Sequence, residues 1–522
     1  MKDYSFDGTI SKEVLCNYLE RSVTAADLYL SDTLEDDIRV IKKIGAKFLG
    51  RATGIWYVIM DDDTHFEMSK SLADRVHAAD PEIILQACVF EAVFKELNDI
   101  KIPQYVFEAF GLKPEDRNFR LSDILFKEQP HGFNWDADGG GVPDITRPET
   151  KMWFYYRATR YIDCGYEALH MGQIHLYTAN DRGYAETYKL FDMIREYARV
   201  HARRHKVLLD AHTHGVNVGG KLLFDYHAMP FTRFALRDRP GDKLVLVREG
   251  FSEGGLNPNG WSANTMPYLM EYDNWGGKTI GDFSTVSVEE RAGMDWWGYD
   301  QIAWFANQDK ESRDAFLEYT YRWVAINNKN AYFEVPFCRR LSSAKMIVKR
   351  ADNGEYGIQK RYQINNPSAA CPMGFGQEDT VERLWREGDD ELRNSMSNPE
   401  DLIRYGAFDK YDLKTGLKLP EKVVLYGSFQ PFVGAALNDS NSEITRMYYV
   451  GDNTYSLSFI MPYAGEYNFA VSLYGTLSAT YCHDRFPRSG STHKRKLTIP
   501  HDNTVVKITY RFIDNEINVE TV

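Results

Sequence analysis

The sequence lacks the long hydrophobic runs and the paired cysteines that mark several classes of protein. No run of 18 apolar residues occurs among its 522 residues, so we expect no membrane-spanning helix. Six cysteines lie far apart and form no CxxC pair, which favours reduced thiols over a disulfide scaffold or a zinc finger. The start, MKDYSFDGTISKEVL, has no apolar signal-peptide core. We therefore expect a cytoplasmic protein, with export left open if a leader has been trimmed.

The sequence also lacks a basic block. Lys and Arg number 62 against 75 Asp and Glu, a formal net charge of −13, which argues against nucleic acid or an anionic membrane as the main partner. Hydrophobic residues make up 43% and charged residues 26%, as in ordinary globular proteins. Aromatic residues reach 14%, which suits a protein that stacks sugar rings but also suits a large core.

Helix and strand patterns alternate over the first 345 residues. No GxGxxG follows the first strand candidate, which disfavours a doubly wound nucleotide-binding sheet. Alternation over about 300 residues instead predicts a (β/α)8 TIM barrel of the α/β class. Its eight strand candidates are Ala46–Thr53, Glu82–Phe90, Tyr166–Leu176, Val207–His212, Leu222–His227, Lys243–Arg248, Pro267–Asp273 and Ala331–Val335.

The pattern changes after the predicted barrel. Residues 346–420 are charged and rich in Asn and Gly, and we interpret them as a connector or an elaboration of the barrel. Short alternating runs such as TYSLSFIMPY and TVVKITYRF fill residues 421–522 and predict a small all-β C-terminal sandwich. Residues 1–345 would then form the catalytic domain.

The strand candidate PYLMEYDNWGG carries the clearest chemical signal. Glu271 and Asp273 share one face of the strand, and Trp275 follows two residues later. Functional residues of such barrels lie at the carboxyl ends of the strands. Glycosidic cleavage needs two carboxyl groups and is helped by an aromatic face that holds the sugar ring. We expect one member of the catalytic pair to be Glu271 or Asp273.

The second carboxyl group should come from another strand end. Glu91 and Asp210 are the preferred candidates, and Glu249 is a further one. Neutral side chains suited to sugar hydroxyls are expected beside them. The predicted substrate-binding residues are Gln173, His175, His212, Asp225, His227, Trp275 and Trp297.

Two parts of this assignment have an alternative interpretation. Gln173 and His175 are predicted to face the barrel interior, with His170 on the opposite face, although they could equally cap the strand end. Trp297 and Trp56 could form sugar platforms or pack where a helix meets the barrel.

A metal site is the competing chemistry. Asp210-Ala-His212-Thr-His214 contains an H-x-H at a strand end, where two imidazoles can reach one ion. It is similar to the H-x-H of amidohydrolase barrels, but those carry it on the first strand and this one falls near the fourth. The run from Asp61 to Asp63 is more typical of a helix start than of a calcium loop.

Several segments together resemble a known family. They are ISKEVLCNYLERSV, IGAKFLGRAT, LQACVFEAVF, PETKMWFYYRATRYIDCGYEALHMGQIHLY, PYLMEYDNWGG and WGYDQIAWFANQ, within residues 8–345. They are similar to largely uncharacterised bacterial glycoside-hydrolase-like TIM-barrel proteins associated with carbohydrate utilisation. The resemblance implies a carbohydrate substrate and assigns no catalytic residue.

The sequence therefore predicts a glycosidase that uses two carboxyl groups, with no cofactor and no metal. A metal-dependent amidohydrolase-like enzyme using His212 and His214, or a non-catalytic carbohydrate-binding barrel, are the alternatives. The sugar, the linkage, the stereochemical course and whether the chain forms a homo-oligomer are left open.

Overall fold

The computed structural model describes most of the chain. The described residues are 2–54, 56, 60–128, 139–231, 236–239, 243–246, 252–273, 301–306, 308–327, 329–341, 346–394, 422–451, 454–473, 480–481, 494–511 and 516–521. Trp275, Trp297 and Glu249 lie outside these residues.

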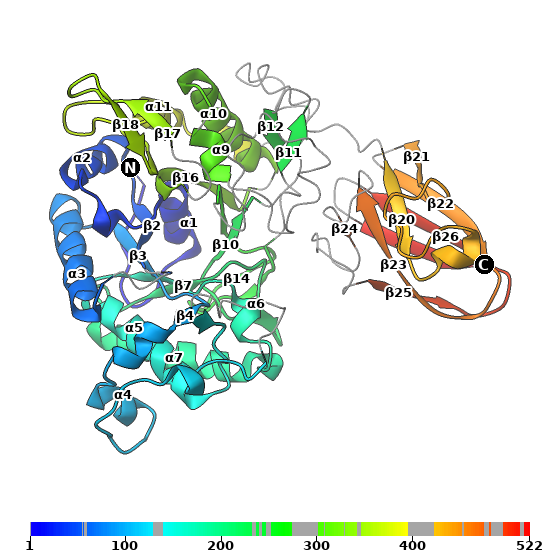
Figure 1. Cartoon of the computed structure of the whole chain (residues 1–522), viewed down its shortest axis with the longest axis horizontal. Helices are drawn as coiled ribbons and strands as arrows, with labels where there is room; N and C mark the ends of the chain where they lie inside the picture. The colour runs from blue at the N-terminus through cyan, green and yellow to red at the C-terminus, as the bar shows by residue number, and fades with distance from the viewer. Residues whose placement is uncertain are drawn as a thin grey trace.

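The first part of the chain is a nearly closed barrel of eight parallel strands, which confirms the predicted barrel (Figure 1). Seven neighbouring pairs form parallel ladders, including β16 with β1. The strands, in order around the barrel, are β1 (Ser22–Ala25), β2 (Phe48–Thr53), β3 (Ile84–Cys88), β6 (Ala168–His170), β7 (Leu208–Asp210), β10 (His227–Pro230), β15 (Tyr268–Glu271) and β16 (Ala331–Arg340).

The eighth junction, between β7 and β10, is joined more loosely. One isolated parallel bridge links His212 to Ala228 just beyond the end of β7. The Ala228 N–H also donates to the Ala211 carbonyl at 3.2 Å. The barrel is therefore continuous through seven ladders and held at its last junction by single hydrogen bonds.

Alternate residues of the strands face opposite sides, which explains why the strands are apolar throughout. Phe48 and Ile84 belong to a hydrophobic cluster inside the barrel, whereas Leu49 and Leu85 belong to the main core. Helix α1 (Lys12–Glu20) contributes Val14, Leu15, Tyr18 and Leu19 to the inner cluster. It thereby closes the amino-terminal end of the barrel and leaves the carboxyl-terminal end for function.

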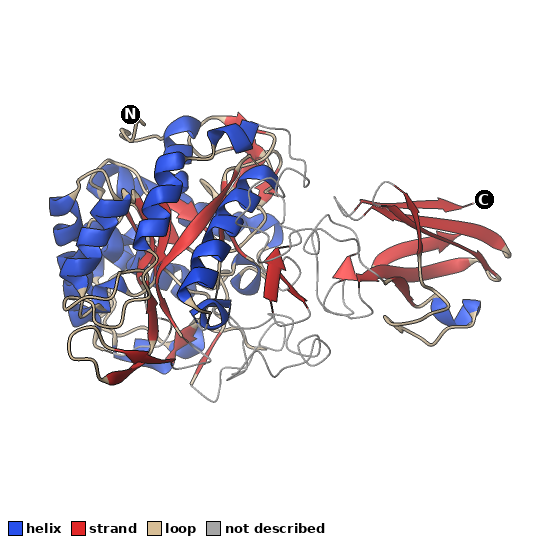
Figure 2. Cartoon of the chain, turned by 90° about the horizontal axis from the view of Figure 1, so that it is seen from above, coloured by secondary structure: helices blue, strands red, loops and turns tan. Residues whose placement is uncertain are grey.

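Helices surround the strands as an outer layer (Figures 1 and 2). The run from Asp61 begins one of them as predicted, because the Asp61 carboxylate accepts the Thr64 N–H at 2.9 Å and caps the helix. The helices between and beside the barrel strands are α2 (Leu34–Ile44), α3 (Asp62–Ala79), α4 (Gln104–Ala109), α5 (Pro148–Asp163), α6 (Ile174–Tyr177), α7 (Ala185–His201), α9 (Gln301–Ala306) and α10 (Lys310–Asn327).

Three strand predictions were wrong. The run Leu222–His227 was assigned to the barrel, but the barrel strand is β10 (His227–Pro230), because the apolar pattern continues beyond His227 and does not mark where the strand begins. The first barrel strand, β1, was missed. The run Lys243–Arg248 was assigned to the barrel, but β12 (Lys243–Leu246) pairs antiparallel with β11 (Leu236–Arg239) as a hairpin. Its apolar pattern does not distinguish a hairpin strand from a barrel strand, whereas Pro240 and Gly241 before it are typical turn residues.

Short strands and two further helices extend the barrel domain. Strand β19 (Arg361–Gln363) pairs with β16, and α11 (Glu378–Glu387) packs against α2 through ion pairs of Glu378 with Arg39 and Lys43. The remaining elements here are β4 (Val93–Phe94), β5 (Gly140–Gly141), β8 (Asn217–Val218), β9 (Lys221–Leu222), β13 (Gly255–Leu256), β14 (Ser262–Ala263), β17 (Met346–Lys349), β18 (Tyr356–Gln359) and α12 (Asp390–Asn394).

The last hundred residues form two antiparallel sheets, drawn at the right of Figure 1. Their facing residues make one hydrophobic cluster, as expected of a sandwich, and β26 alternates buried and exposed positions. The predicted domain boundaries at 345 and 420 stay predictions. The strands are β20 (Val423–Gly427), β21 (Tyr448–Gly451), β22 (Thr454–Met461), β23 (Gly465–Leu473), β24 (Thr480–Tyr481), β25 (Arg495–Ile499), β26 (Thr504–Arg511) and β27 (Glu516–Thr521).

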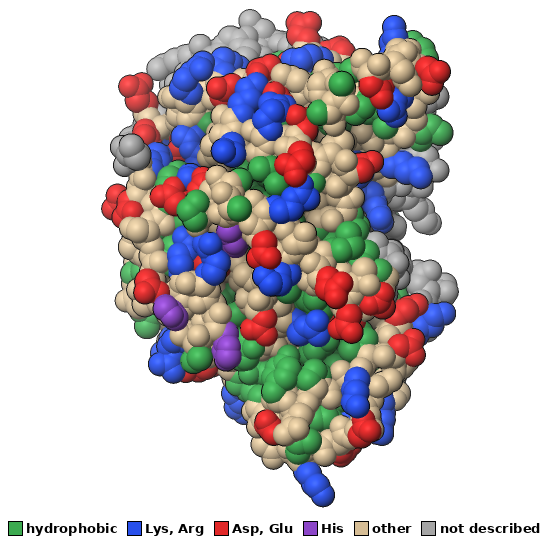
Figure 3. Space-filling view, turned by 90° about the vertical axis from the view of Figure 1, so that its left-hand side faces the viewer, with side chains coloured by type: hydrophobic (Ala, Val, Ile, Leu, Met, Phe, Trp, Pro, Cys, Tyr) green, Lys and Arg blue, Asp and Glu red, His purple; other side chains and the backbone are tan. Residues whose placement is uncertain are grey.

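The barrel surface mixes charges of both signs. Figure 3 shows acidic and basic side chains interspersed over one face, without a large patch of either sign. Within the described part of the chain, no helix combines the length and the hydropathy that crossing a bilayer requires.

Candidate active site

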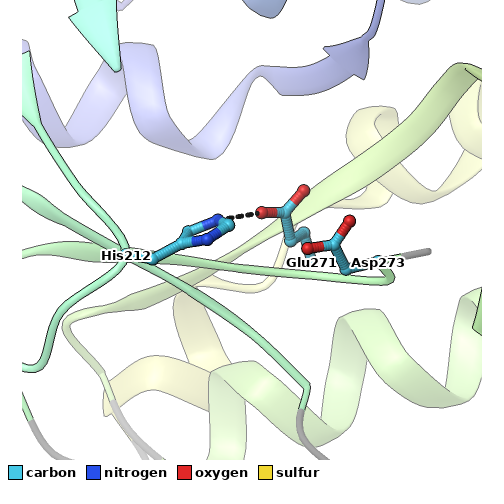
Figure 4. A group of neighbouring side chains, drawn as sticks. All are labelled: His212, Glu271 and Asp273. Atoms are coloured by element: carbon cyan, nitrogen blue, oxygen red, sulfur yellow. Dashed lines mark hydrogen bonds and ion pairs between the residues drawn. The ribbon is translucent and has the colours of Figure 1, made fainter. Parts of the chain in front are cut away.

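Two arginines, two carboxylates and one histidine meet inside the carboxyl-terminal end of the barrel. Glu271, the last residue of β15, accepts hydrogen bonds from Arg51 and, at 2.9 Å, from Arg339. Asp273 accepts a hydrogen bond from Arg339 and lies 3.7 Å from Arg51 Nη1. His212 Nε2 lies 3.0 Å from Glu271 Oε1 (Figure 4). We call these five residues the ion cluster. Guanidinium groups at this distance favour the charged form of both carboxyl groups.

An irregularity in β2 directs Arg51 into the barrel. The pairing of β2 with β3 shifts register between Leu49 and Thr53, and Arg51 adopts a φ of 55°, which is uncommon for a residue with a side chain. Its N–H donates to Gln86 Oε1 at 2.9 Å, which holds this conformation. Strained backbone held by specific contacts is typical of functional sites.

His212 is neutral in this environment. Burial, and next the positive charge of Arg51, hold its pKa well below the usual range. Its Nε2 lies 2.5 Å from Arg51 Nη2 as well as near Glu271, and a neutral ring nitrogen either accepts from the arginine or donates to the carboxylate. His212 therefore positions these two charged groups without adding a third charge.

Beneath the ion cluster lies a second, fully bonded network. Gln86 Nε2 donates to Asp210 at 2.7 Å and to the Tyr226 hydroxyl at 2.8 Å. Asp210 also accepts from Tyr226 at 3.1 Å and contacts His170 Nδ1 at 2.9 Å. No described hydrogen bond or ion pair joins Asp210 to either arginine of the ion cluster, so its position favours a supporting role.

Glu334 is the carboxyl group directly beside Glu271. The two residues are register partners on β16 and β15, and both point into the barrel. A Cβ on Gly50 would lie 1.9 Å from Glu334 Oε1, so only glycine leaves room for it. Burial raises the pKa of Glu334, and the nearby Asp210 charge adds to this effect while Arg51 opposes it.

Glu91 lies on the loop after β3 and is 2% exposed. Its Oε2 accepts the Gln173 backbone N–H at 3.0 Å, and its Oε1 accepts from Gln173 Nε2 at 3.2 Å. Gly172, with φ of 60°, passes so close that a Cβ there would lie 2.0 Å from Glu91 Oε2. Burial raises the pKa of Glu91, and the hydrogen bonds that its carboxyl group accepts from backbone N–H groups partly offset this effect.

The predicted orientation of the fourth barrel strand was wrong. His170, expected to face the helices, points inward, and its ring meets that of His212 edge-on at 4.6 Å. Strand β6 ends at His170, so Gln173 starts helix α6 and His175 lies exposed within it. Strand β6 is only three residues long, so residues beyond His170 do not alternate between the inner and outer faces of the barrel.

The other predicted residues lie apart from the ion cluster or outside the described residues. Asp225 is bound by Lys206 at 2.9 Å and Arg195 at 3.3 Å, and these cations lower its pKa against the effect of burial. His227 Nδ1 contacts the Ser252 hydroxyl at 2.6 Å, and burial lowers its pKa to about 3. Trp275 and Trp297 are not described.

One group of described residues has the spacing of a metal site. His212, Glu271 and Asp273 each place one potential ligand atom within 4.8 Å of the others. The H-x-H hypothesis expected His212 with His214 and Asp210 instead. Arg51 and Arg339 already bind both carboxylates, and a divalent cation would have to displace these guanidinium groups.

Sequence reasoning missed four residues of this region: Arg51, Gln86, Glu334 and Arg339. Gln86 and Glu334 could have been found, because each shares the inward parity of its strand, and Glu334 lies near the end of the predicted strand Ala331–Val335. Arg51 could not, because its direction depends on the register shift in β2.

Comparisons with protein families and with curated proteins found no match. Solved structures similar to this chain include a pullulanase from Bacillus acidopullulyticus, at 26% identity over 19% of this chain and 11% of that one, with a TM-score of 0.16. An α-galactosidase from Thermus thermophilus is 14% identical over 38% and 44% of the two chains, with a TM-score of 0.23. A GH27 β-L-arabinopyranosidase from Geobacillus stearothermophilus is 12% identical over 86% and 80%, with a TM-score of 0.28. The chain thus spans less than half of the first two structures, and TM-scores this low carry no argument about its activity.

Proposed function

We propose that the chain is a glycoside hydrolase that works with two carboxyl groups of contrasting protonation. One observation carries the proposal. Two arginines bind Glu271 and Asp273 at the barrel mouth, whereas Glu91 is buried against neutral amides and has a raised pKa. Carboxyl groups whose environments separate their protonation states are the usual acid and base of glycosidic cleavage.

Glu91 takes the role of general acid. It donates its proton to the glycosidic oxygen as the bond to the anomeric carbon breaks. Glu271, ionised beside Arg51 and Arg339, either attacks the anomeric carbon or deprotonates the water that attacks it. Asp273 lies beside Glu271 and shares its two arginines. Because these arginines favour the charged form of Asp273, it is unsuited to act as the acid.

Contacts link the two proposed catalytic residues. Glu91 accepts from Gln173, three residues beyond His170, the His170 ring meets that of His212, and His212 contacts Glu271. Neighbouring contacts thus lead from one carboxyl group to the other at the carboxyl-terminal end of the barrel. Gln173 Oε1, which accepts no hydrogen bond from the described residues, then offers an acceptor to a sugar hydroxyl.

The first test is hydrolysis of a broad panel of glycans and aryl glycosides by the full chain, with and without EDTA. We expect cleavage that EDTA does not change. Cleavage abolished by EDTA and restored by a divalent cation would instead support a metal-dependent hydrolase using His212, Glu271 and Asp273. Saccharide binding without any cleavage would make the chain a binding protein and contradict the proposal.

A second prediction concerns the pH profile. Because burial raises the pKa of Glu91, the acid stays protonated to a higher pH than an exposed glutamic acid, and activity should fall as pH rises through that pKa. Glu91→Gln should lower kcat by about 10²–10⁴-fold for poor leaving groups, affect activated aryl glycosides less, and remove this alkaline limb. An unchanged limb in Glu91→Gln would rule out Glu91 as the acid. Glu108→Gln, at an exposed position of α4, serves as the matched control.

A further inference from the structure

The loop that carries Glu91 also forms a wall of a large cavity. This cavity has a volume of about 670 Å³, within the range of small-molecule binding sites. Phe90 and Ala92, the neighbours of Glu91 in sequence, line it, and so does Cys88 at the end of β3. The cavity therefore borders the loop that carries Glu91 and reaches the carboxyl-terminal end of β3 at Cys88.

Aromatic side chains from three segments line this cavity. Trp56 follows β2, Phe90 follows β3 and Trp153 belongs to α5. All three are partly exposed, and Trp153 also packs against the main core. Trp56 and Phe90 meet edge-on with their ring centres 5.3 Å apart. Flat apolar faces of this kind pack against the C–H faces of a sugar ring.

Polar groups held in fixed positions complete the lining. Asp62 accepts from the Tyr156 hydroxyl at 2.5 Å and from Arg157. Arg157 is 8% exposed and packs over the rings of Phe66 and Trp153, at 4.6 and 5.5 Å from their centres. Groups immobilised before a ligand arrives lose little entropy on binding hydroxyls.

The charge of the lining selects among saccharides. Five lining residues are acidic (Asp61, Asp62, Asp63, Glu96 and Asp99), and three are basic (Lys101, Arg157 and Arg160). An excess of carboxylates disfavours uronic acids and phosphorylated sugars. Carboxylates and guanidinium groups side by side can accept from and donate to neutral hydroxyl groups.

We propose that this cavity is a binding subsite for a neutral sugar unit of the substrate, with Trp56 as its stacking platform. The inference rests on the proposed glycosidase function and extends it. It assigns the cavity to holding the part of the substrate that lies beyond the bond being cleaved. Binding energy gained there lowers KM without taking part in the chemical step.

The test compares Trp56→Ala, Trp56→Phe and the control Tyr356→Ala, which removes a 72% exposed ring from the β18 hairpin. Full-length proteins are assayed with maltotetraose, xylotetraose and cellotetraose, and with trigalacturonate as the acidic counterpart. We expect Trp56→Ala to raise KM for a cleaved neutral oligosaccharide about tenfold with kcat within about twofold. Trp56→Phe should retain most of the affinity, Tyr356→Ala should match the parent, and trigalacturonate should bind more weakly.

Binding of the same oligosaccharides, measured by calorimetry, separates this inference from the proposed function. Cleavage with a KM unaffected by Trp56→Ala would overturn the subsite and leave the glycosidase intact. Binding that depends on Trp56 without cleavage would support the subsite and contradict the glycosidase. Failure of every neutral oligosaccharide to bind would overturn the subsite. Where Trp56→Ala does not fold, the sugar-induced change in tryptophan fluorescence should be smaller in Trp56→Phe than in the parent, and an equal change would overturn it.

Discussion

Glu271→Gln should reduce hydrolysis by at least about 10³-fold, because the ionised carboxylate is needed either as nucleophile or as base. The amide has the same shape but carries no charge to stabilise the developing positive charge on the sugar. The effect should fall on kcat, measured on the best glycoside of the panel.

The matched control is Glu82→Gln. Glu82 lies before β3, at the opposite end of the barrel, with a side chain that is 54% exposed and paired with Lys47. It should retain full activity. Circular dichroism of both variants distinguishes lost chemistry from lost fold. A Glu271→Gln variant that folds and hydrolyses at the parent rate would remove the ion cluster from the mechanism.

Arg339→Met should destabilise the barrel by about 3–5 kcal/mol, because it leaves the buried Glu271 and Asp273 without one of the two arginines beside them. The arginine side chain is 3% exposed and the two carboxylates 1% and 6%, so water cannot replace the lost partner. Urea unfolding followed by barrel tryptophan fluorescence measures the loss.

Its control is Arg199→Met, which breaks a pair with Glu196 whose side chains are 67% and 66% exposed. That change should cost no more than about 1 kcal/mol. The destabilisation by Arg339→Met should shrink as pH falls, since protonation removes the uncompensated charges. Equal stabilities of the two variants would mean that Arg339 does not neutralise the buried carboxylates.

The fold was largely predictable because barrel strands are buried on both faces. Runs such as EIILQACVF are apolar throughout, and helices separate them at regular intervals. The errors have physical causes. Strand β1 is four residues long, too short for an apolar run, and the run at Lys243 belongs to a local hairpin. A strand as short as β1 leaves no apolar run in the sequence. A hairpin strand leaves the same apolar run as a barrel strand.

The candidate site was only partly predictable. Glu271, Asp273 and His212 meet as expected from strand ends that share one mouth. Their charge balance was not foreseen, because it depends on Arg51, which a register shift turns inward, and on Arg339 near the end of the ten-residue strand β16. A sequence shows which carboxylates lie near a strand end, but the cations that determine their protonation come from other strands.

The loosely joined junction between β7 and β10 also has a kinetic meaning. Arg51 and Glu271 are 220 residues apart in sequence. His212 lies just after β7, on one side of the junction, and Glu271 lies on β15, the strand that follows β10 on the other side. Contacts this distant form late, after the entropy of closing a long loop has been overcome. A chain emerging from the ribosome therefore exposes Glu271 and Asp273 without Arg339 until the last barrel strand is made. The ion cluster then forms as β15 and β16 dock, so recovery of catalytic competence should report the final step of barrel assembly.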